Sequence, residues 1–419
     1  MPGAFRSHGT TLFLIAYASA LAGWGLCVVS RLRPGWAFLI AVVIAVRIVP
    51  ALTSPELSHD VYRYLWDGRV AAAGINPYAF APADPRLEGL RTEWHALINH
   101  PEIRSIYPPA AQAVFLFVGL SGTGLAGWKG LLLLADLLTI GIIARRWDSR
   151  TALAYGLFPL VLIEGAWNAH IELLMTLILL VAYLSLIRGR DVAAGGFLAL
   201  ATLVKIVPIV ALPVFLRHAN RRLALCAVFA GTTAVFVVPF VRTGLMPGFG
   251  EYARRWSFNS PAYELVASGI EWMHVTESLR SGWTHVKDLL GVERISPHVY
   301  SLLYPDAVTR AILGVALILA LFAAMRTSHT PASAVANSIG VLLLCSPAVH
   351  PWYWLALVPF AILSRGIPWI LLAAASPYSY MLYDGRSPWL VFAVCYGLPL
   401  IVAAVVRMWF KPPNEDLGS

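Results

Sequence analysis

The chain has 419 residues, of which 58% are hydrophobic and only 13% are charged. Soluble globular domains average about 45–50% apolar residues, so this composition excludes a soluble domain and indicates an all-α polytopic membrane protein. The net charge of +9 does not indicate a nucleic-acid partner. The basic residues gather in short loops between apolar segments, where they set membrane topology and attract anionic membrane lipids.

Apolar segments follow one another along the chain, which predicts a single integral membrane domain over residues 1–419. Several segments are shorter than the ~20 residues of a perpendicular crossing, so about 11–13 transmembrane helices are expected. In chain order the segments are 11–30, 36–52, 110–123, 128–145, 151–166, 170–187, 192–216, 222–241, 308–325, 334–348, 352–364, 367–382 and 388–407.

Arginine clusters near residues 189 and 219 both mark cytoplasmic loops. A single crossing between them would violate the positive-inside rule, so 192–216 is predicted to be two half-helices that meet at LVKIVP. Residues 110–145 hold either two short spans or one span and a re-entrant piece. The same orientation places residues 53–109 and 242–307 outside, and their length marks them as functional or independently structured outer loops.

The stretch HDVYRYLWDGRVAAAGINPY, residues 59–78, is the densest polar cluster in the chain. Written as a helix over 59–72, it places Asp60, Arg63 or Tyr64, and Asp67 on one face. A carboxylate just beyond an apolar span is poorly hydrated, which raises its pKa towards the range of a general base. Asp60 is therefore a candidate catalytic base; the alternative is a solvated face on which Asp pairs with Arg.

The other face of this helix suits the headgroup level of a membrane, where Trp and Tyr are favoured. It carries Tyr62, Leu65, Trp66 and Arg69.

Two polar features interrupt later apolar segments. Asn168, His170 and Glu172 lie in WNAHIELL at the expected outer ends of two helices, where ionisable residues are functional candidates. A metal pair in HxE lacks a third ligand at suitable spacing, and a helix-capping histidine is the structural alternative. Lys205 lies too deep in its segment to snorkel, so it is either a phosphate contact or a structural partner of Asp136.

Three further motifs carry candidate ligands. In SPAVHPWYW, His350 is either a donor to a phosphate or an interfacial histidine. In the second long loop, Arg254 and Arg255 beside Trp256 suit phosphate capture and sugar stacking, or an ordinary interfacial anchor. In IYPPAAQ, Tyr107 either contacts a substrate or only precedes the prolines that begin a helix.

Taken in order, DVYRYLWDGRVAAAGINPY, INHPEIRSIYPPAAQ, WNAHIE, LVKIVP and HPWYW resemble bacterial membrane glycosyltransferases of the GT-C fold. The chain is most similar to glycosyltransferase family 87 and related polyprenol-phosphate-mannose-dependent mannosyltransferases, over roughly residues 36–365. The resemblance implies transfer of a hexose, with inversion, from a polyprenyl-phosphate carrier to a lipid or glycan hydroxyl. The active site would face outward from the cytoplasmic membrane, with Asp60 as base.

The resemblance and the residues agree on roles. Lys205, His350, Arg254 and Arg255 are expected to stabilise the leaving phosphate as electrophiles. No cofactor and no metal are expected, because the acids in DVYRYLWD are too far apart for a DxD-like pair. The residues expected to bind sugar or acceptor are Arg63, Tyr64, Asp67, Tyr107, Asn168, His170, Glu172, Trp256, Trp352 and Tyr353. The alternatives are a transporter or lipid flippase, another lipid-linked transferase, and a non-catalytic scaffold.

Overall fold

The computed structural model describes residues 7–30, 35–289, 291 and 303–409. Within these residues the chain is helical, and its only β-pairing is one bridge between Phe258 and Ala348. The predicted all-α class is therefore confirmed. Part of the expected second outer loop, residues 290 and 292–302, lies outside the described residues.

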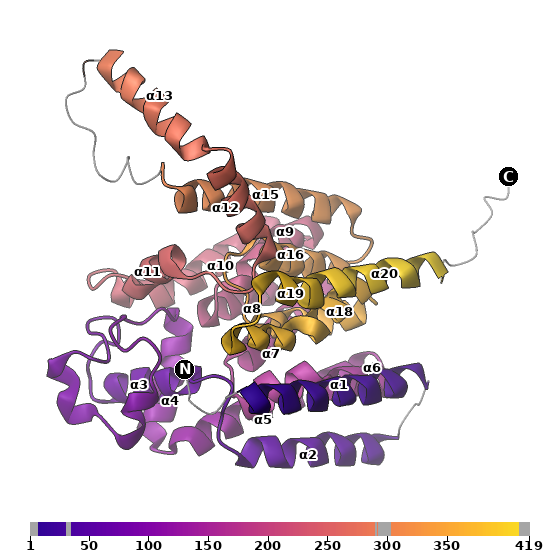
Figure 1. The fold of residues 1–419 in the computed structure, drawn as a ribbon. Helices are drawn as coiled ribbons and strands as arrows, with labels where there is room; N and C mark the ends of the chain where they lie inside the picture. The colour runs from indigo at the N-terminus through magenta and orange to yellow at the C-terminus, as the bar shows by residue number, and fades with distance from the viewer. Residues whose placement is uncertain (1–6, 31–34, 290, 292–302, 410–419) are drawn as a thin grey trace.

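Five helices among the described residues are long and apolar enough to cross a membrane. They comprise α1 (Ser7–Val29), α5 (Gly124–Arg146), α10 (Arg222–Val237) continued by η5 (Val238–Phe240), α15 (Pro305–Thr327), and the run of α19 (Pro388–Phe392), η8 (Ala393–Gly397) and α20 (Leu398–Trp409). A sixth is the pair of η3 (Val161–Trp167) and α7 (Glu172–Ile187), which is bent by 112°. Figure 1 shows α1, α5, α15 and α20 running in roughly the same direction.

Shorter apolar helices fill the space between these spans. They are α2 (Trp36–Leu52), α4 (Pro109–Ser121), α8 (Asp191–Val204), η4 (Val207–Ala211) with α9 (Leu212–His218), and α16 (Pro331–Cys345). The remaining elements of this part are α6 (Ser149–Gly156), η6 (Pro351–Ala356), α17 (Val358–Leu363), α18 (Ile367–Ala375) and η7 (Ser376–Asp384). A multi-pass membrane protein is confirmed, and the count of 11–13 crossings stays a prediction.

The break predicted at LVKIVP is present. Helix α8 ends at Val204, Lys205 is extended with φ −154° and ψ 142°, and η4 begins at Val207. Pro208 favours the break, because proline has no N–H to donate to the Val204 carbonyl and its ring would clash with that carbonyl in a continuous helix. Residues 110–145 form the short α4 and the full-length α5, and the expected span over 151–166 is divided into α6 and η3.

The polar stretch at 59–72 forms α3 (Asp60–Ala72), which packs on α4. Two glycines allow this close approach: a Cβ at Gly68 would lie 2.2 Å from the Phe115 carbonyl oxygen, and one at Gly119 would lie 2.3 Å from the Gly68 carbonyl oxygen. No other residue fits these two positions without separating the helices.

The face of α3 with Tyr62, Leu65, Trp66 and Arg69 was expected to lie at the headgroup level of the membrane. Arg69 on this face is exposed, but Trp66 is buried. Trp66 is 1% exposed and forms a small core with Val70, Leu87 and Ile98 from the following segment, which contains η1 (Pro85–Leu90) and η2 (Glu93–Leu97). Tyr62 stacks on Trp94 of the same segment. The first long connection, residues 53–108, is therefore a folded unit that holds α3 from both sides.

The second long connection contains α11 (Pro247–Arg255), α12 (Pro261–Trp272) and α13 (Val275–Leu289). In Figure 1, α11 lies above α3 at the same end of the bundle, and α13 projects away from it. Gly248 of α11 lies directly against the first connection, because a Cβ there would be 2.0 Å from the Arg104 carbonyl oxygen. The two connections thus meet at one end of the molecule, where the candidate site lies.

Candidate active site

A cavity of about 770 Å³ lies between the two long connections and the ends of several helices. Asp60, Lys205 and His350, which come from three distant parts of the chain, all line it. One end has polar walls with Ser58, Asn99 and His100, whereas an apolar wall comes from α15, α16 and η4. The sequence expectation that these three functional groups meet in one pocket therefore agrees with the geometry.

Asp60 is the first residue of α3, and its side chain is 23% exposed and faces the cavity. Its backbone N–H donates to the Ser58 hydroxyl at 3.3 Å, while the N-cap position of α3 is His59, whose side chain makes no capping hydrogen bond. Burial raises the pKa of the Asp60 carboxyl above its ordinary value, although Lys205 and a hydrogen bond from Asn99 act in the opposite direction. A partly desolvated carboxyl of this kind can serve as a general base.

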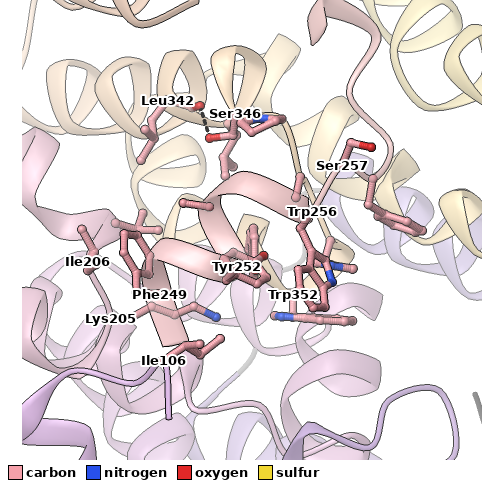
Figure 2. Close-up of a pocket in the computed structure, with 18 of the residues that line it drawn as sticks. Ile106, Lys205, Ile206, Phe249, Tyr252, Trp256, Ser257, Leu342, Ser346 and Trp352 are labelled. Carbon is pink, nitrogen blue, oxygen red and sulfur yellow. Dashed lines mark hydrogen bonds between the residues drawn. The ribbon is translucent and has the colours of Figure 1, made fainter. Parts of the chain in front are cut away.

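Lys205 reaches into the cavity from the break between α8 and η4. Figure 2 shows its ammonium group directed toward Trp352, below Tyr252. It forms an ion pair with Glu172 and lies 4.4 Å from the centre of the Tyr353 ring. The alternative that Lys205 pairs with Asp136 is wrong, because Asp136 binds Arg47 at 2.7 Å in a separate buried pair.

A continuous stack of aromatic rings forms one wall. His170 stacks on Trp352 at 4.1 Å, and Trp352 stacks on His350 at 4.5 Å. His350 in turn stacks on Phe258 at 4.5 Å, and Phe258 stacks on Tyr383 at 5.2 Å. The bridge between Phe258 and Ala348 ties the second connection to the loop that carries His350. Stacking on two sides fixes the plane of the His350 ring.

The surroundings of His350 favour the neutral form of its ring. Burial, with a smaller contribution from the Lys205 charge, lowers the pKa of His350 to about 3. A ring packed between two aromatic faces is poorly hydrated, which disfavours its cationic form. Its Nδ1 atom is buried without a hydrogen-bond partner, so His350 can still act as a neutral hydrogen-bonding group.

Three residues of α3 have mainly structural contacts. Arg63 lines the cavity but donates to Asp67 at 2.9 Å. Asp67 also accepts from Ser105 at 2.5 Å and from Gln112 at 3.0 Å. Tyr64 packs among the rings of Tyr107, Phe115 and Trp128. Tyr64 and Asp67 do not line the cavity, and instead anchor α3.

The polar side chains of the WNAHIE segment contact different parts of the structure. Asn168 accepts from the Leu57 N–H at 3.1 Å and donates to the Ile163 carbonyl at 3.1 Å, which joins the segment to the chain just before α3. His170 and Glu172 point in different directions, one toward Asp60 and the other to Lys205. Among the residues that the structure describes, no three His, Cys, Asp or Glu side chains are grouped to hold a metal ion.

The second connection contributes aromatic groups and not its arginine doublet. Trp256 lines the cavity and stacks on Tyr252 at 5.2 Å. Arg254 and Arg255 are exposed and do not line it, and Arg255 pairs with Glu251 at 3.0 Å. Arg310 of α15 lines the cavity instead, where it donates to the Trp256 carbonyl at 3.4 Å.

Sequence reasoning missed several residues of this site. Tyr252 lines the cavity and shares a 2.6 Å hydrogen bond between its hydroxyl and that of Tyr353. Tyr252 is in α11, and Trp256 is the extended residue that directly follows this helix. A helical spacing of four between the two aromatic residues could have identified Tyr252 from the sequence. Asn99 and Tyr383 carried no comparable signal. Tyr107 and Tyr353 line the cavity as expected.

The fold and this cavity define a helical membrane protein with a carboxylate and a cation in one largely apolar pocket. The family model for glycosyltransferase family 87 matches residues 106–347, more than half of the chain. The chain belongs to glycosyltransferase family 87, and the resemblance found in the sequence is confirmed.

Two curated relatives are similar over most of the chain. The alpha-(1->6)-mannopyranosyltransferase A of Mycobacterium tuberculosis is 27% identical over 398 residues, which cover 85% of this chain and 73% of the relative. A protein of Mycolicibacterium smegmatis named as a probable alpha-(1->6)-mannopyranosyltransferase is 26% identical over 75% of this chain and 63% of its own length. No solved structure matches the chain.

Proposed function

We propose that this glycosyltransferase moves mannose from a polyprenyl-phosphate carrier to a hydroxyl of a lipid or glycan acceptor, with inversion at the sugar. The relatives named as mannopyranosyltransferases support the sugar. The observation that carries the proposal is the meeting of Asp60 and Lys205 in one cavity with an apolar wall. A polyprenyl-phosphate sugar needs these three surroundings: a cation for phosphate, a base for the acceptor, and an apolar surface for the lipid.

In the proposed reaction, Asp60 removes the proton of the acceptor hydroxyl while its oxygen attacks the anomeric carbon. The bond from that carbon to the phosphate oxygen breaks, and its electron pair leaves with the polyprenyl phosphate. Lys205 stabilises the charge of this leaving group, and His350 donates a hydrogen bond from a neutral ring. The leaving phosphate has a low pKa, so charge stabilisation replaces a general acid.

The apolar wall is the proposed seat of the lipid part of the donor. Leu313 and Leu317 of α15 and Leu342 and Leu343 of α16 line this side of the cavity. Residues of α15 beyond the cavity, such as Ile318 and Leu319, are more than half exposed, as expected for a surface that faces lipid. A chain entering between these helices would need no polar partner.

The transfer is tested with full-length protein and polyprenyl-phosphate [³H]mannose, with octyl α-mannoside as acceptor. The wild type should form a labelled dimannoside, and Asp60→Asn should abolish it while the protein stays folded. Replacing the donor by polyprenyl-phosphate [³H]glucose tests the sugar. Full activity of Asp60→Asn would refute the assigned base, and no transfer by the wild type would refute the donor and acceptor classes.

We further propose that the active site faces outward from the cytoplasmic membrane. The arginine clusters of the loops near residues 189 and 219 support this orientation. Glu88 is 76% exposed in the first connection, so a membrane-impermeant maleimide should label Glu88→Cys in intact cells. The wild type, with its own cysteines, is the matched control, and labelling only after the cells are opened would contradict the orientation.

A further inference from the structure

Behind Asp60 lies a buried line of polar groups that the proposed reaction does not use. His170 Nδ1 is 3.9 Å from Asp60 Oδ2, and His170 Nε2 is 3.5 Å from Glu164 Oε2. The other Glu164 oxygen accepts from the Tyr380 hydroxyl at 2.8 Å. The side chains of His170 and Glu164 are completely buried, whereas that of Asp60 is 23% exposed.

The backbone that presents these two groups is irregular. Glu164 belongs to the π-helix η3, and His170 lies at the 112° bend before α7. Ala169 between them has φ +57°, a conformation that costs energy for a residue with a side chain. Single-turn π-helices and strained residues recur at functional sites, because a regular helix would point such groups elsewhere.

The His170 ring is held so that each nitrogen faces one carboxylate. It stacks on Trp352 with an interplanar angle of 12°, and Trp352 is itself 6% exposed. Neither ring nitrogen has a hydrogen-bond partner within bonding distance. Buried polar atoms in native structures nearly always have partners, so two free nitrogens between two carboxylates point to a role that begins when the site is occupied.

We propose that Asp60, His170 and Glu164 form a proton relay, with His170 and Glu164 as positioning residues behind the base. The inference rests on the proposed function, in which Asp60 receives the acceptor proton. The relay runs in the ionised form of Glu164, in which a neutral His170 with its proton on Nε2 directs its Nδ1 lone pair at Asp60. When the acceptor proton reaches Asp60, it passes on to Nδ1, and the Nε2 proton passes to Glu164 Oε2.

The relay conserves charge and protons at each step. Asp60 returns to a carboxylate, His170 remains neutral with its proton now on Nδ1, and Glu164 becomes a neutral acid. The reverse transfer resets the line after the product leaves and water reaches Asp60. Both gaps exceed a hydrogen bond. Rotation of Asp60 with the substrate would shorten the gap to His170 Nδ1, and the relay also requires the Glu164 carboxylate to approach His170 Nε2, since catalytic hydrogen bonds tighten in occupied active sites.

Other charged and titratable groups lie near Asp60, His170 and Glu164 and influence their ionisation. Lys205 and Glu172 form a pair beside it. The remaining groups that act on Asp60, His170 or Glu164 are Arg63, Asn99, His100, Asn168, His350 and Tyr380. Asn168 Nδ2 donates to Glu164 Oε2 at 3.5 Å. None of these stands between His170 and either carboxylate in the contacts described, so the relay is expected to depend on Glu164 and not on them.

The test compares Glu164→Gln, His170→Phe and the double variant, using polyprenyl-phosphate [³H]mannose and octyl α-mannoside. Glu164→Gln keeps the shape of the side chain and the Tyr380 hydrogen bond but cannot take a proton. His170→Phe keeps the stack on Trp352 and loses both nitrogens. Asp191→Asn is the matched control, since Asp191 is 3% exposed and accepts from the Arg221 N–H outside the cavity.

Each single variant should lower kcat about 100-fold, with the donor KM within about twofold of wild type. The double variant should be no slower than His170→Phe alone, because two members of one relay act in series. The control should keep wild-type kcat. The relay is overturned if Glu164→Gln keeps wild-type kcat, or if the two effects multiply in the double variant. Loss of activity in Asp60→Asn tests the base separately from this result.

Discussion

Replacing Lys205 by methionine separates its proposed role in binding phosphate from its contact with Glu172. The Glu172 side chain is 1% exposed and that of Lys205 is 17% exposed, so the variant leaves a buried carboxylate without its cation. Removing one partner of a buried ion pair costs about 3–5 kcal/mol. Because water reaches the lysine end, we expect the lower limit, a loss of about 3 kcal/mol in the free energy of unfolding.

The double variant Lys205→Met with Glu172→Gln removes the uncompensated charge as well. Its free energy of unfolding should return to within about 1 kcal/mol of wild type, since a neutral pair of similar volume replaces the ions. Its activity should stay at least about 100-fold low, the usual loss when a group that stabilises the developing charge is removed. Unfolding in a denaturing detergent and transfer from polyprenyl-phosphate [³H]mannose measure the two quantities.

The buried pair of Arg47 and Asp136 is the matched control, because both side chains are at most 2% exposed and neither lines the cavity. The double variant Arg47→Met with Asp136→Asn should recover stability and activity together. If Lys205→Met with Glu172→Gln were also fully active, Lys205 would be no more than the structural partner of Glu172, and the phosphate assignment would be refuted.

Three other predictions concern single positions. Burial raises the pKa of Asp60, so ionisation weakens folding as pH rises through that pKa; Asp60→Asn should therefore unfold at a higher temperature than wild type at pH 7, and the difference should vanish below about pH 4. His350→Phe should lower kcat/KM about 10-fold by the same factor at pH 6 and pH 8, because the native ring is neutral at both. Arg254→Ala with Arg255→Ala should change transfer less than about twofold, since these exposed side chains lie outside the cavity; a donor KM raised tenfold would contradict this placement.

The sequence was most informative where a polar residue conflicts with its surroundings. Lys205 in an apolar segment, with Pro208 three residues later, predicted both the helix break and a place in a site. Asp60 followed from the same reasoning at the end of an apolar span. Both inferences use only the sequence around the residue. A charge within or beside an apolar segment is costly to bury, so the residue can be recognised as functional without knowledge of its tertiary contacts.

Partners across the fold could not be predicted, because they depend on which helices become neighbours. Asp136 was the partner expected for Lys205 from the sequence, whereas the packing of α7 beside α8 brings Glu172 to it. The neutral state of His350 likewise depends on Phe258 and Trp352, which come from separate segments. Arg254 and Arg255 also depend on the fold, since both side chains are exposed and lie outside the cavity that the neighbouring Tyr252 and Trp256 line.

The irregular backbone of this chain supports the location of the site independently of its charges. At membrane depth, backbone outside a regular helix is tolerated only where it is covered by protein or lines a cavity. The chain is interrupted at Lys205, at the bend before α7 that carries His170, and at the loop before η6 that carries His350. All three interruptions converge on the cavity or on the relay behind it, whereas α1, α5 and α15 pass the region as unbroken helices. The helix breaks that carry Lys205, His170 and His350 thus identify the site better than the exposed Arg254 and Arg255 do.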